Sequence, residues 1–393
     1  MWYDDGGEGD EPMTEGNARR RVAVIGGGAG GLAAAVAAGG ADAEVIILEK
    51  ANRVGKKLLK TGNGRCNLSN RHVSSEGYNR PGFVAPLLGT FGCDALVDFF
   101  ASIGLWTVTD GEGRVYPRSD TAASVLDVLR LAAAERGVRE ICAAEAAAVE
   151  RHGRGFVVRT REGGEFSADR VIVSSGGGTA LLRPLGHAYV PFSPALCPLR
   201  TDPEPIRGLS GLRVKCRASL RRDGREVFAD SGELLFRDYG VSGILALDLS
   251  RYALPGDELA LDLLLETDRA ALREKLEARR SLGRAGAEGL TGVFHRRINE
   301  ALVRAAGGTD PGALAEAMKD YRLRILGPGD IHNAQVTRGG AAVDAFDPLT
   351  LESRLVPGLY CVGEALDIDG RCGGYNLHWA FASGLAAGRS AAE

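Results

Sequence analysis

The sequence has few of the features that mark a metal-binding, secreted or fibrous protein. None of its 7 cysteines belongs to a Cys-x-x-C pair, so we expect neither a zinc site nor a dithiol redox pair, and a reducing, cytoplasmic location fits best. The 6 histidines are dispersed, which predicts no metal site. The 55 glycines follow no Gly-x-y period, which excludes collagen.

An excess of one charge is also missing. The chain has 48 Lys and Arg against 51 Asp and Glu, and its net charge of -3 indicates neither nucleic acid nor an anionic membrane as a partner, although a local patch is compatible with it. The uncharged stretch 22–41 contains seven glycines, which makes it poor material for a membrane span. We therefore expect a soluble protein of unspecified oligomeric state with a small-molecule substrate, no nucleic-acid partner and no membrane.

What is present begins with a strand–helix–strand pattern. Residues 21–26 and 43–49 read as buried strands, and residues 29–38 read as an alanine-rich helix between them. Gly26, Gly28 and Gly31 form G-x-G-x-x-G, which alone would occur about once by chance in so glycine-rich a chain. Its position between strand and helix, with Glu49 ending the next strand, favours a dinucleotide site over a merely structural turn.

Each part of this pattern has a physical role in a dinucleotide site. The first glycine permits the tight turn, the second lets the backbone approach a pyrophosphate, and the third lets helix and strand pack closely. Ala29 and Gly30 lie with them at the helix N-terminus, whose N–H groups and partial positive charge attract phosphate. Glu49 is expected to accept hydrogen bonds from an adenosine ribose and to disfavour a 2′-phosphate.

Two segments favour FAD over NAD at this site. Residues 50–70 form a loop rich in Gly, Asn and Lys where an ordinary dehydrogenase would have a helix. Near the other end, a strand at 358–363 leads into Glu364 and a glycine pair that opens a helix at 376–389. FAD-binding domains of the glutathione-reductase type are built in this way. No second G-x-G-x-x-G exists, so NAD(P)H is expected only as a transient electron donor.

Changes in composition divide the chain. Five prolines fall between Pro191 and Pro205, short alternating strands with an Asp223-Gly224 hairpin turn follow, and residues 268–326 look helical. The expected organisation is a disordered acidic tail (1–20), a first part of the FAD-binding domain (21–194), a β-rich insert (195–266), a helical insert (267–332) and the C-terminal part of the FAD-binding domain (333–393).

Several motifs resemble those of the BaiN-like flavoproteins, a family that includes aminoacetone oxidases and bile-acid Δ4-type reductases. They are TGNGRCNLSN (61–70), GRVYPRS (113–119), GELLFRDYGVSG (232–243) and GLYCVGEALDIDGRCGGYNLHWAFASG (358–384), and the resemblance runs from Arg21 onward. It implies an α/β fold, with a Rossmann-like FAD-binding domain of the glutathione-reductase type interrupted by a β-barrel-like plus helical insert.

The resemblance also assigns cofactor contacts. It implies that Lys50 joins Glu49 at the ribose, that Ala146 presents a backbone amide to adenine, and that Ser175 and Gly176 stand where relatives have Thr-Gly. The remaining contacts are a loop beside the flavin (Gly62, Asn63, Gly64, Arg65, Cys66, Asn67), a strand end at the ribityl phosphate (Gly363, Glu364) and a helix N-terminus at the flavin pyrimidine (Gly373, Gly374, Tyr375, Asn376).

The catalytic residues are left open by the sequence. His378 is a candidate acid or base, Tyr375 a candidate pocket residue and Arg65 a candidate partner for a substrate carboxylate, yet each also has a packing or cofactor role. Cys66 is expected to pack rather than to act as a redox thiol. The chain departs from its relatives in a shortened loop before His187 and in lacking a histidine in segment 236–238.

Together these features predict an FAD-dependent oxidoreductase that transfers hydride between flavin N5 and a small organic molecule. One form of this prediction is an NAD(P)H-dependent reductase of an enone-like C=C bond. The alternatives are an amine or aminoketone oxidase that uses oxygen, a flavin-binding protein without turnover, and an NAD-dependent dehydrogenase without flavin. The glycine pair and strand near the C-terminus oppose the last of these.

Overall fold

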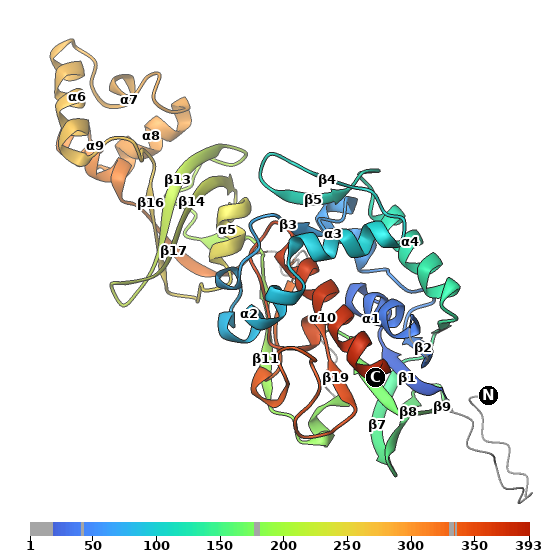
Figure 1. The fold of residues 1–393 in the computed structure, drawn as a ribbon. Coiled ribbons are helices and arrows are strands. Elements are labelled where there is room, and N and C mark those ends of the chain that lie inside the picture. Colours follow the sequence, from blue (N-terminus) through green and yellow to red (C-terminus); the bar gives the residue numbers. More distant parts are fainter. Residues whose placement is uncertain (1–18, 41–42, 177–180, 330–333, 335) are drawn as a thin grey trace, which may run out of the picture. The chain divides into compact units, whose positions relative to one another are not determined.

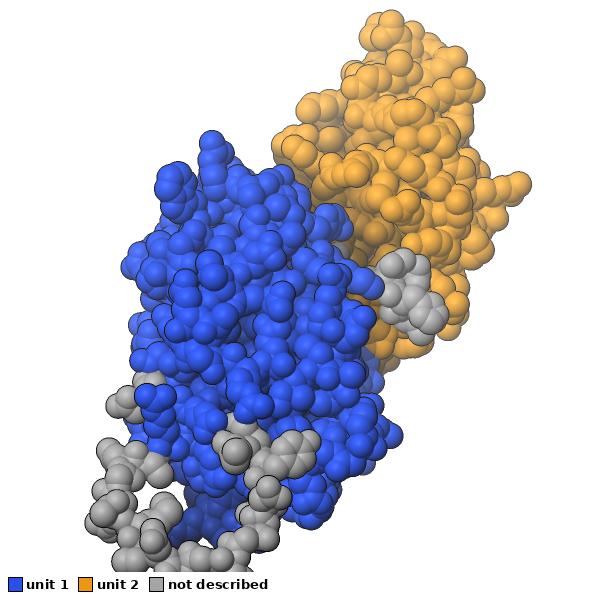
Figure 2. All heavy atoms as spheres, turned by 90° about the vertical axis from the view of Figure 1, so that its right-hand side faces the viewer, with its two compact units in different colours: residues 1–193, 337–393 blue, residues 194–336 orange. Residues whose placement is uncertain are grey.

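The computed structural model describes residues 19–40, 43–176, 181–329, 334 and 336–393 (Figure 1). The chain forms two compact units, which Figure 2 distinguishes by colour. Unit 1 combines the segments before Pro194 and after Val336, and unit 2 is the continuous segment Pro194–Val336. The predicted disordered tail lies outside the described residues except for its last two positions.

Unit 1 is built on a five-stranded parallel sheet. The strand order is β19-β10-β1-β2-β6, with bounds Leu359–Cys361, Arg170–Val173, Arg20–Ile25, Ala43–Glu49 and Arg139–Cys142. The strands are parallel neighbours throughout, and their apolar side chains are almost all buried, as in sheets that are covered on both faces. Parallel strands bring their carboxyl ends to one edge, where open α/β sheets bind ligands.

Two helices from opposite ends of the sequence pack together in unit 1. Helix α1 (Ala29–Gly39) and helix α10 (Tyr375–Ala392) approach so closely that a Cβ on Gly384 would lie 2.2 Å from the carbonyl oxygen of Gly30. Gly388 meets the carbonyl oxygen of Ala34 in the same way, at 2.3 Å. Because only glycine fits at these positions, the small residues of α10 allow the two backbones to touch.

The rest of unit 1 consists of smaller elements around this core. Helix α4 (Ala122–Glu135) begins after Thr121, whose hydroxyl accepts a hydrogen bond from the Ala123 N–H at 3.4 Å and so caps the helix. The other elements are α2 (Pro81–Thr90), α3 (Cys93–Ser102), α4 (Ala122–Glu135), the sheet β3-β5-β4 (Ser69–Asn70, Arg114–Pro117, Thr107–Thr109), the sheet β7-β8-β9 (Ala146–His152, Gly155–Thr160, Glu165–Ala168) and the pair β11-β18 (Tyr189–Ala195, Val336–Ala341).

Unit 2 is a closed barrel with helices in the connections between its strands. The barrel order is β12-β15-β14-β13-β16-β17, with bounds Leu199–Thr201, Gly240–Ser242, Arg225–Arg237, Arg213–Arg222, Glu258–Asp262 and Tyr321–Pro328. Asp223 and Gly224 make the predicted turn between β13 and β14. The helices are α5 (Ile244–Leu249), α6 (Arg269–Ser281), α7 (Gly286–Gly289), α8 (Arg296–Ala305) and α9 (Pro311–Lys319). The predicted fold class is confirmed.

The sequence interpretation is wrong at one element of unit 2. The sequence predicts a helical insert that includes residues 321–326, but these residues belong to β17, which pairs with β12 and β16 and closes the barrel. Tyr321, Leu323 and Ile325 point into the core and alternate with exposed arginines. This period of two is the pattern of a half-buried strand, and it overrides the helical tendency of the preceding residues.

Among the described helices, none by itself has both the length and the apolar character that a membrane crossing requires. Helices α2 and α3 together pass the same test by length and composition only, with a bend of 47° between them.

Candidate active site

The glycine turn between β1 and α1 has the geometry that the sequence predicts. Gly26 has φ +99°, and a Cβ there would lie 2.6 Å from the carbonyl oxygen of Ser174. A Cβ on Gly31 would lie 1.9 Å from the carbonyl oxygen of Gly26, so the helix can pack on the turn only without a side chain. A Cβ on Gly28, the N-cap of α1, would meet no protein atom within 4 Å. The turn therefore has no room for a side chain at Gly26 or Gly31, whereas the space beside Gly28 is free of protein atoms.

Glu49 fixes the glycine turn to the second strand. One carboxylate oxygen accepts a hydrogen bond from the Gly27 N–H and the other from the Ala51 N–H, both at 2.8 Å. A carboxylate has about four acceptor positions, so both oxygens can still accept hydrogen bonds from ribose hydroxyls. Lys50 beside it is exposed. Ala146 begins β7, shortly after Ala144, whose N–H donates to the carbonyl oxygen of Glu49 at 3.0 Å.

The carboxyl ends of β10 and β19 bring further predicted residues to the same edge. The Ser174 N–H donates to the carbonyl oxygen of Ile25 at 2.8 Å, which holds the end of β10 beside the glycine turn. A Cβ on Gly176 would lie 3.7 Å from a carboxylate oxygen of Glu364. Glu364 forms an ion pair with Lys57, which ties this strand end to the loop that follows Glu49.

The loop at 62–67 has an unusual backbone. Four of its residues have φ between 55° and 85°, namely Gly62, Asn63, Gly64 and Cys66. Left-handed backbone at a residue other than glycine costs about 1–3 kcal/mol and tends to occur at functional sites. Gly62 and Asn63 are exposed, whereas Cys66 and Asn67 are buried, so the loop runs from the surface into the core within a few residues.

The N-terminus of α10 meets this loop. Gly374, the N-cap, has φ +104°, and a Cβ there would lie 2.4 Å from the carbonyl oxygen of Ser69 and 2.8 Å from Asn67 Oδ1. The Asn70 amide donates to the carbonyl oxygen of Gly373 at 3.0 Å. The Asn376 amide accepts from the Gly370 N–H and donates to the Gly370 carbonyl, both at 2.8 Å, so it shapes the preceding turn.

The structure gives His378 a packing role. The ring is fully buried, with Nδ1 2.8 Å from Ser69 Oγ and Nε2 2.9 Å from the carbonyl oxygen of Phe91. Because a carbonyl can only accept, Nε2 carries the proton and Nδ1 accepts from the serine hydroxyl. Burial lowers the pKa of His378 to about 4, so the ring is neutral near pH 7. Both ring nitrogens are engaged, which argues against a role as acid or base.

The other candidate side chains are also engaged within the protein. The Tyr375 hydroxyl donates to the carbonyl oxygen of His72 at 2.8 Å. The Arg65 guanidinium donates to Asp120 at 2.6 Å and stacks on the ring of Tyr116 at 4.2 Å. Burial raises the pKa of the Cys66 thiol to about 12, which keeps it protonated and makes it a poor nucleophile. These contacts favour positioning roles.

Contacts that the sequence analysis missed hold the site together. The pairs are Lys57 with Glu364, Ser69 with His378, Asn70 with Gly373 and Arg80 with Asp367. Each joins a residue of the segment 57–80 to one of the segment 364–378. Ser69, Asn70 and the four partners at 364–378 belong to the motifs of the sequence analysis, whereas Lys57 and Arg80 do not, and nothing in a single sequence pairs residues about 300 positions apart.

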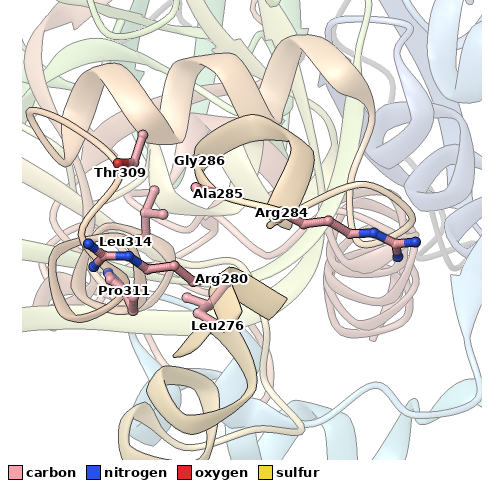
Figure 3. Close-up of a pocket in the computed structure, with 9 residues that line it drawn as sticks. Leu276, Arg280, Arg284, Ala285, Gly286, Thr309, Pro311 and Leu314 are labelled. Carbon is pink, nitrogen blue, oxygen red and sulfur yellow. The ribbon is translucent and has the colours of Figure 1, made fainter. Parts of the chain in front are cut away.

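Two hollows of unit 2 are lined by described residues that include none of the predicted site residues. The smaller, between α6, α7 and α9, has a volume of about 10 Å³, room for about one water (Figure 3). Arg280 and Arg284 at its rim extend in opposite directions, so they do not converge on a ligand. A larger hollow of about 700 Å³ is lined by several alanines and by charged residues that include Arg304 and Glu316.

The residues of unit 1 fit an FAD molecule. The open position at Gly28 leaves space for a pyrophosphate against the N-terminus of α1, and Glu49 is placed for the ribose.

Known proteins resemble this chain along nearly its whole length. It is 37% identical over 385 residues to a 3-dehydro-bile acid delta(4,6)-reductase from Clostridium scindens, covering 90% of this chain and 93% of that protein. It is 26% identical over 371 residues to a ribosomal RNA dihydrouridine synthase from Escherichia coli, covering 88% and 91%. A ribosomal RNA dihydrouridine synthase from Haemophilus influenzae is 25% identical over 376 residues, covering 87% and 91%.

A family model described as the HI0933-like protein Rossmann domain matches residues 20–390. This match and the similarity to the reductase confirm the resemblance carried by the sequence motifs. They also confirm FAD as the cofactor and an oxidoreductase as the class of enzyme. The chain belongs to the HI0933-like family of FAD-binding oxidoreductases.

Proposed function

We propose that the protein is an FAD-dependent reductase of a C=C bond conjugated to a carbonyl group in a small organic molecule, with NAD(P)H as the electron donor. The observation that carries this proposal is the 37% identity, across nine-tenths of the chain, to a reductase of such a bond in a bile acid. FAD supplies the hydride, at N5 of its ring system. The protein supplies binding, orientation and electrostatics.

The residues of unit 1 have separable roles in this reaction. Gly26, Gly28 and Gly31 hold the pyrophosphate at the start of α1, and Glu49 holds the adenosine ribose. The loop 62–67 and the N-terminus of α10 hold the ring system. A helix N-terminus carries a partial charge of about +0.5, which favours the negative charge that the reduced ring carries near N1 and C2=O.

The test is an anaerobic absorption experiment. The purified yellow protein is reduced with NADH and then with NADPH, and a 3-oxo-Δ4 steroid acid or its saturated counterpart is added. Recovery of the oxidised spectrum with the unsaturated compound alone supports the proposal. Reoxidation only by oxygen would favour the oxidase, and a protein that neither nicotinamide nor an amine substrate bleaches would favour a flavoprotein without turnover.

A second candidate substrate is a uracil base in RNA. Its C5=C6 bond is conjugated to the C4 carbonyl, so it presents the same chemistry, and two relatives are named ribosomal RNA dihydrouridine synthases. Exposed cations follow Glu49, and none of them forms an ion pair with another described residue: Lys50, Arg53, Lys56 and Lys60. Buried Val54, Gly55 and Leu58 anchor the same segment. A fixed basic surface of this kind suits phosphates.

Removing positive charges from the segment that follows Glu49 distinguishes between the two candidate substrates. If the substrate is RNA, Lys56→Gln combined with Lys60→Gln should weaken binding of a ribosomal RNA fragment and reduce its dependence on salt. Dihydrouridine formation should fall with it, while the Kd for FAD stays unchanged. If the substrate is a free small molecule, the double variant should reduce a 3-oxo-Δ4 steroid acid at the rate of the wild type.

We place the reaction in the reducing cytoplasm, since all seven cysteines are free thiols.

A further inference from the structure

Positive charge is concentrated in the helices that unit 2 carries between two strands of its barrel. Residues 269–304 contain nine Lys or Arg against four Glu and no Asp, whereas the whole chain has a net charge of -3. This segment forms α6, α7 and α8, which lie between β16 and β17 in the sequence. A local excess of positive charge attracts a partner that carries many negative charges.

Ion pairs neutralise only part of this charge. Arg269, Arg273 and Arg296 each pair with a glutamate. The other six cations form no ion pair with any described residue, and all of them except the half-buried Arg279 are exposed: Lys275, Arg279, Arg280, Arg284, Arg297 and Arg304. Their charge is therefore available to a partner.

The backbone of a nearby turn holds two of these arginines in one place. Arg297 and Arg304 lie seven positions apart, which is about two turns along α8. Arg297 Nη1 donates to the carbonyl oxygen of Gly208 at 2.9 Å, and Arg304 Nη2 donates to that of Arg207 at 3.1 Å. Because the two carbonyl groups belong to consecutive residues, the two guanidinium groups are held near one another, although neither has a carboxylate partner among the described residues.

The turn that carries these carbonyl groups is anchored in the core of unit 2. Ile206 and Leu209 are buried, whereas Arg207 and Gly208 between them are exposed. Arg207 supplies a third guanidinium, which lies 3.6 Å from Glu204, and an ion pair as exposed as this one is weak. These three arginines are called the arginine surface below: Arg207, Arg297 and Arg304.

A hollow borders the arginine surface. Its volume is about 700 Å³, and Arg304 lines it together with Glu204 and Pro205 of the turn. Five alanines line it as well. A nucleic acid whose phosphates contact the arginine surface can therefore place an unpaired base against apolar side chains. The bases of a duplex are stacked and paired, so this arrangement favours a single strand.

We propose that the arginine surface binds the phosphate backbone of single-stranded RNA, an inference that rests on the second candidate substrate, a uracil base in RNA. Guanidinium groups bind phosphate oxygens well, and Arg297 and Arg304 each keep N–H donors beyond the one given to a carbonyl. The surface is open and does not enclose a free phosphate ion. Further unpaired cations extend over α6 and the segment that follows it, so a polymer with many phosphates matches the charge, and release of its counterions supplies the affinity.

The test is the salt dependence of RNA binding to the full-length protein, measured by fluorescence anisotropy with a labelled single-stranded RNA of mixed sequence. Arg297→Gln combined with Arg304→Gln, the neutral variant, should bind about tenfold more weakly near physiological salt. The slope of log K against log salt should become shallower by about 1.4, since each phosphate contact of a single strand contributes about 0.7. Arg269→Gln combined with Arg273→Gln removes the same charge from arginines that are already paired, and should keep the slope of the wild type.

A second variant separates charge from the packing of the turn. Arg297→Lys combined with Arg304→Lys, the charged variant, keeps both positive charges and should bind RNA within about threefold of the wild type. If the charged variant bound RNA as weakly as the neutral variant, the arginines would act only by holding the turn, and the assignment would fail. Displacement of the RNA by inorganic phosphate at the same concentration of phosphate groups would also overturn it, in favour of a site for free phosphate.

The remaining outcomes distinguish this inference from the proposed function. If the wild type forms dihydrouridine in RNA while the wild type and the neutral variant have equal slopes, the arginine surface is refuted and the RNA substrate stands. If the wild type does not bind RNA, the arginine surface and the second candidate substrate are refuted together. Reduction of a 3-oxo-Δ4 steroid acid would be unaffected by either result.

Discussion

Two glycines of the same turn should respond in opposite ways to the same substitution. Gly31→Ala places a methyl group 1.9 Å from the carbonyl oxygen of Gly26, whereas Gly28→Ala places one where no protein atom lies within 4 Å. Gly28 has φ −80° and ψ −168°, which alanine adopts without strain. The first change therefore conflicts with the fold, and the second conflicts only with a ligand that approaches Gly28.

The magnitudes follow from these distances. At Gly31 the helix must move by about 1 Å to relieve the contact, and overpacking of this kind costs about 1–3 kcal/mol. The better helix propensity of alanine returns up to about 1 kcal/mol, so we expect a net loss of about 1–2 kcal/mol. At Gly28 the poorer N-cap and the reduced freedom of the unfolded chain nearly cancel, to within about 0.5 kcal/mol. A methyl group between backbone and pyrophosphate should weaken FAD binding at least about tenfold.

Urea denaturation of the cofactor-free variants and FAD titration by fluorescence quenching measure both effects. Gly28→Ala should match the stability of the wild type and bind FAD poorly. Gly31→Ala should lose stability before any cofactor is added. If Gly28→Ala bound FAD as tightly as the wild type, the pyrophosphate would not lie at this turn, and the cofactor assignment of the whole glycine pattern would fail.

Two further predictions concern buried titratable groups. The folded-state pKa of His378 is about 4 and the unfolded-state pKa about 6.5, so the unfolded chain binds the proton first as pH falls. Between pH 7 and pH 5 the free energy of unfolding should drop by about 2 kcal/mol more in the wild type than in His378→Asn, as measured by urea denaturation; parallel curves would contradict the buried neutral ring. Cys66, whose thiol pKa is raised to about 12, should resist a thiol reagent at pH 8 in the folded protein and react after unfolding. Modification of folded wild type that Cys66→Ala abolishes would show that the thiol is accessible.

The parts of the fold that were predictable are those with local chemical causes. The glycine turn and the Asp223-Gly224 hairpin each depend on residues within a few positions of one another. The placement of the loop 62–67 and the start of α10 beside the flavin stays a prediction, and it comes from resemblance and not from spacing.

The parts that were not predictable depend on partners distant in the sequence. The sequence offers His378 as a candidate acid or base, whereas its ring is bonded to Ser69 and Phe91, which are 309 and 287 positions away. The contact of the Arg65 guanidinium with Asp120 likewise joins residues 55 positions apart, and a role of Arg65 toward the cofactor stays a prediction. Strand β17 is hidden in the sequence because helical segments precede it, although Tyr321, Leu323 and Ile325 alternate with polar residues as in a half-buried strand.

The sheet of unit 1 has a consequence for synthesis of the protein on the ribosome. Its edge strand β19 and the helix α10 that packs on α1 are made more than 300 residues after β1, and the whole of unit 2 lies between them in the sequence. The earlier strands must therefore emerge without one side of their sheet and without the helix that packs against α1. Unit 2 has its own closed barrel and can fold during this interval. We therefore expect FAD to bind late in folding. A truncated chain that ends before Leu359 should contain a folded barrel, while its FAD-binding domain lacks β19 and α10 and stays incomplete.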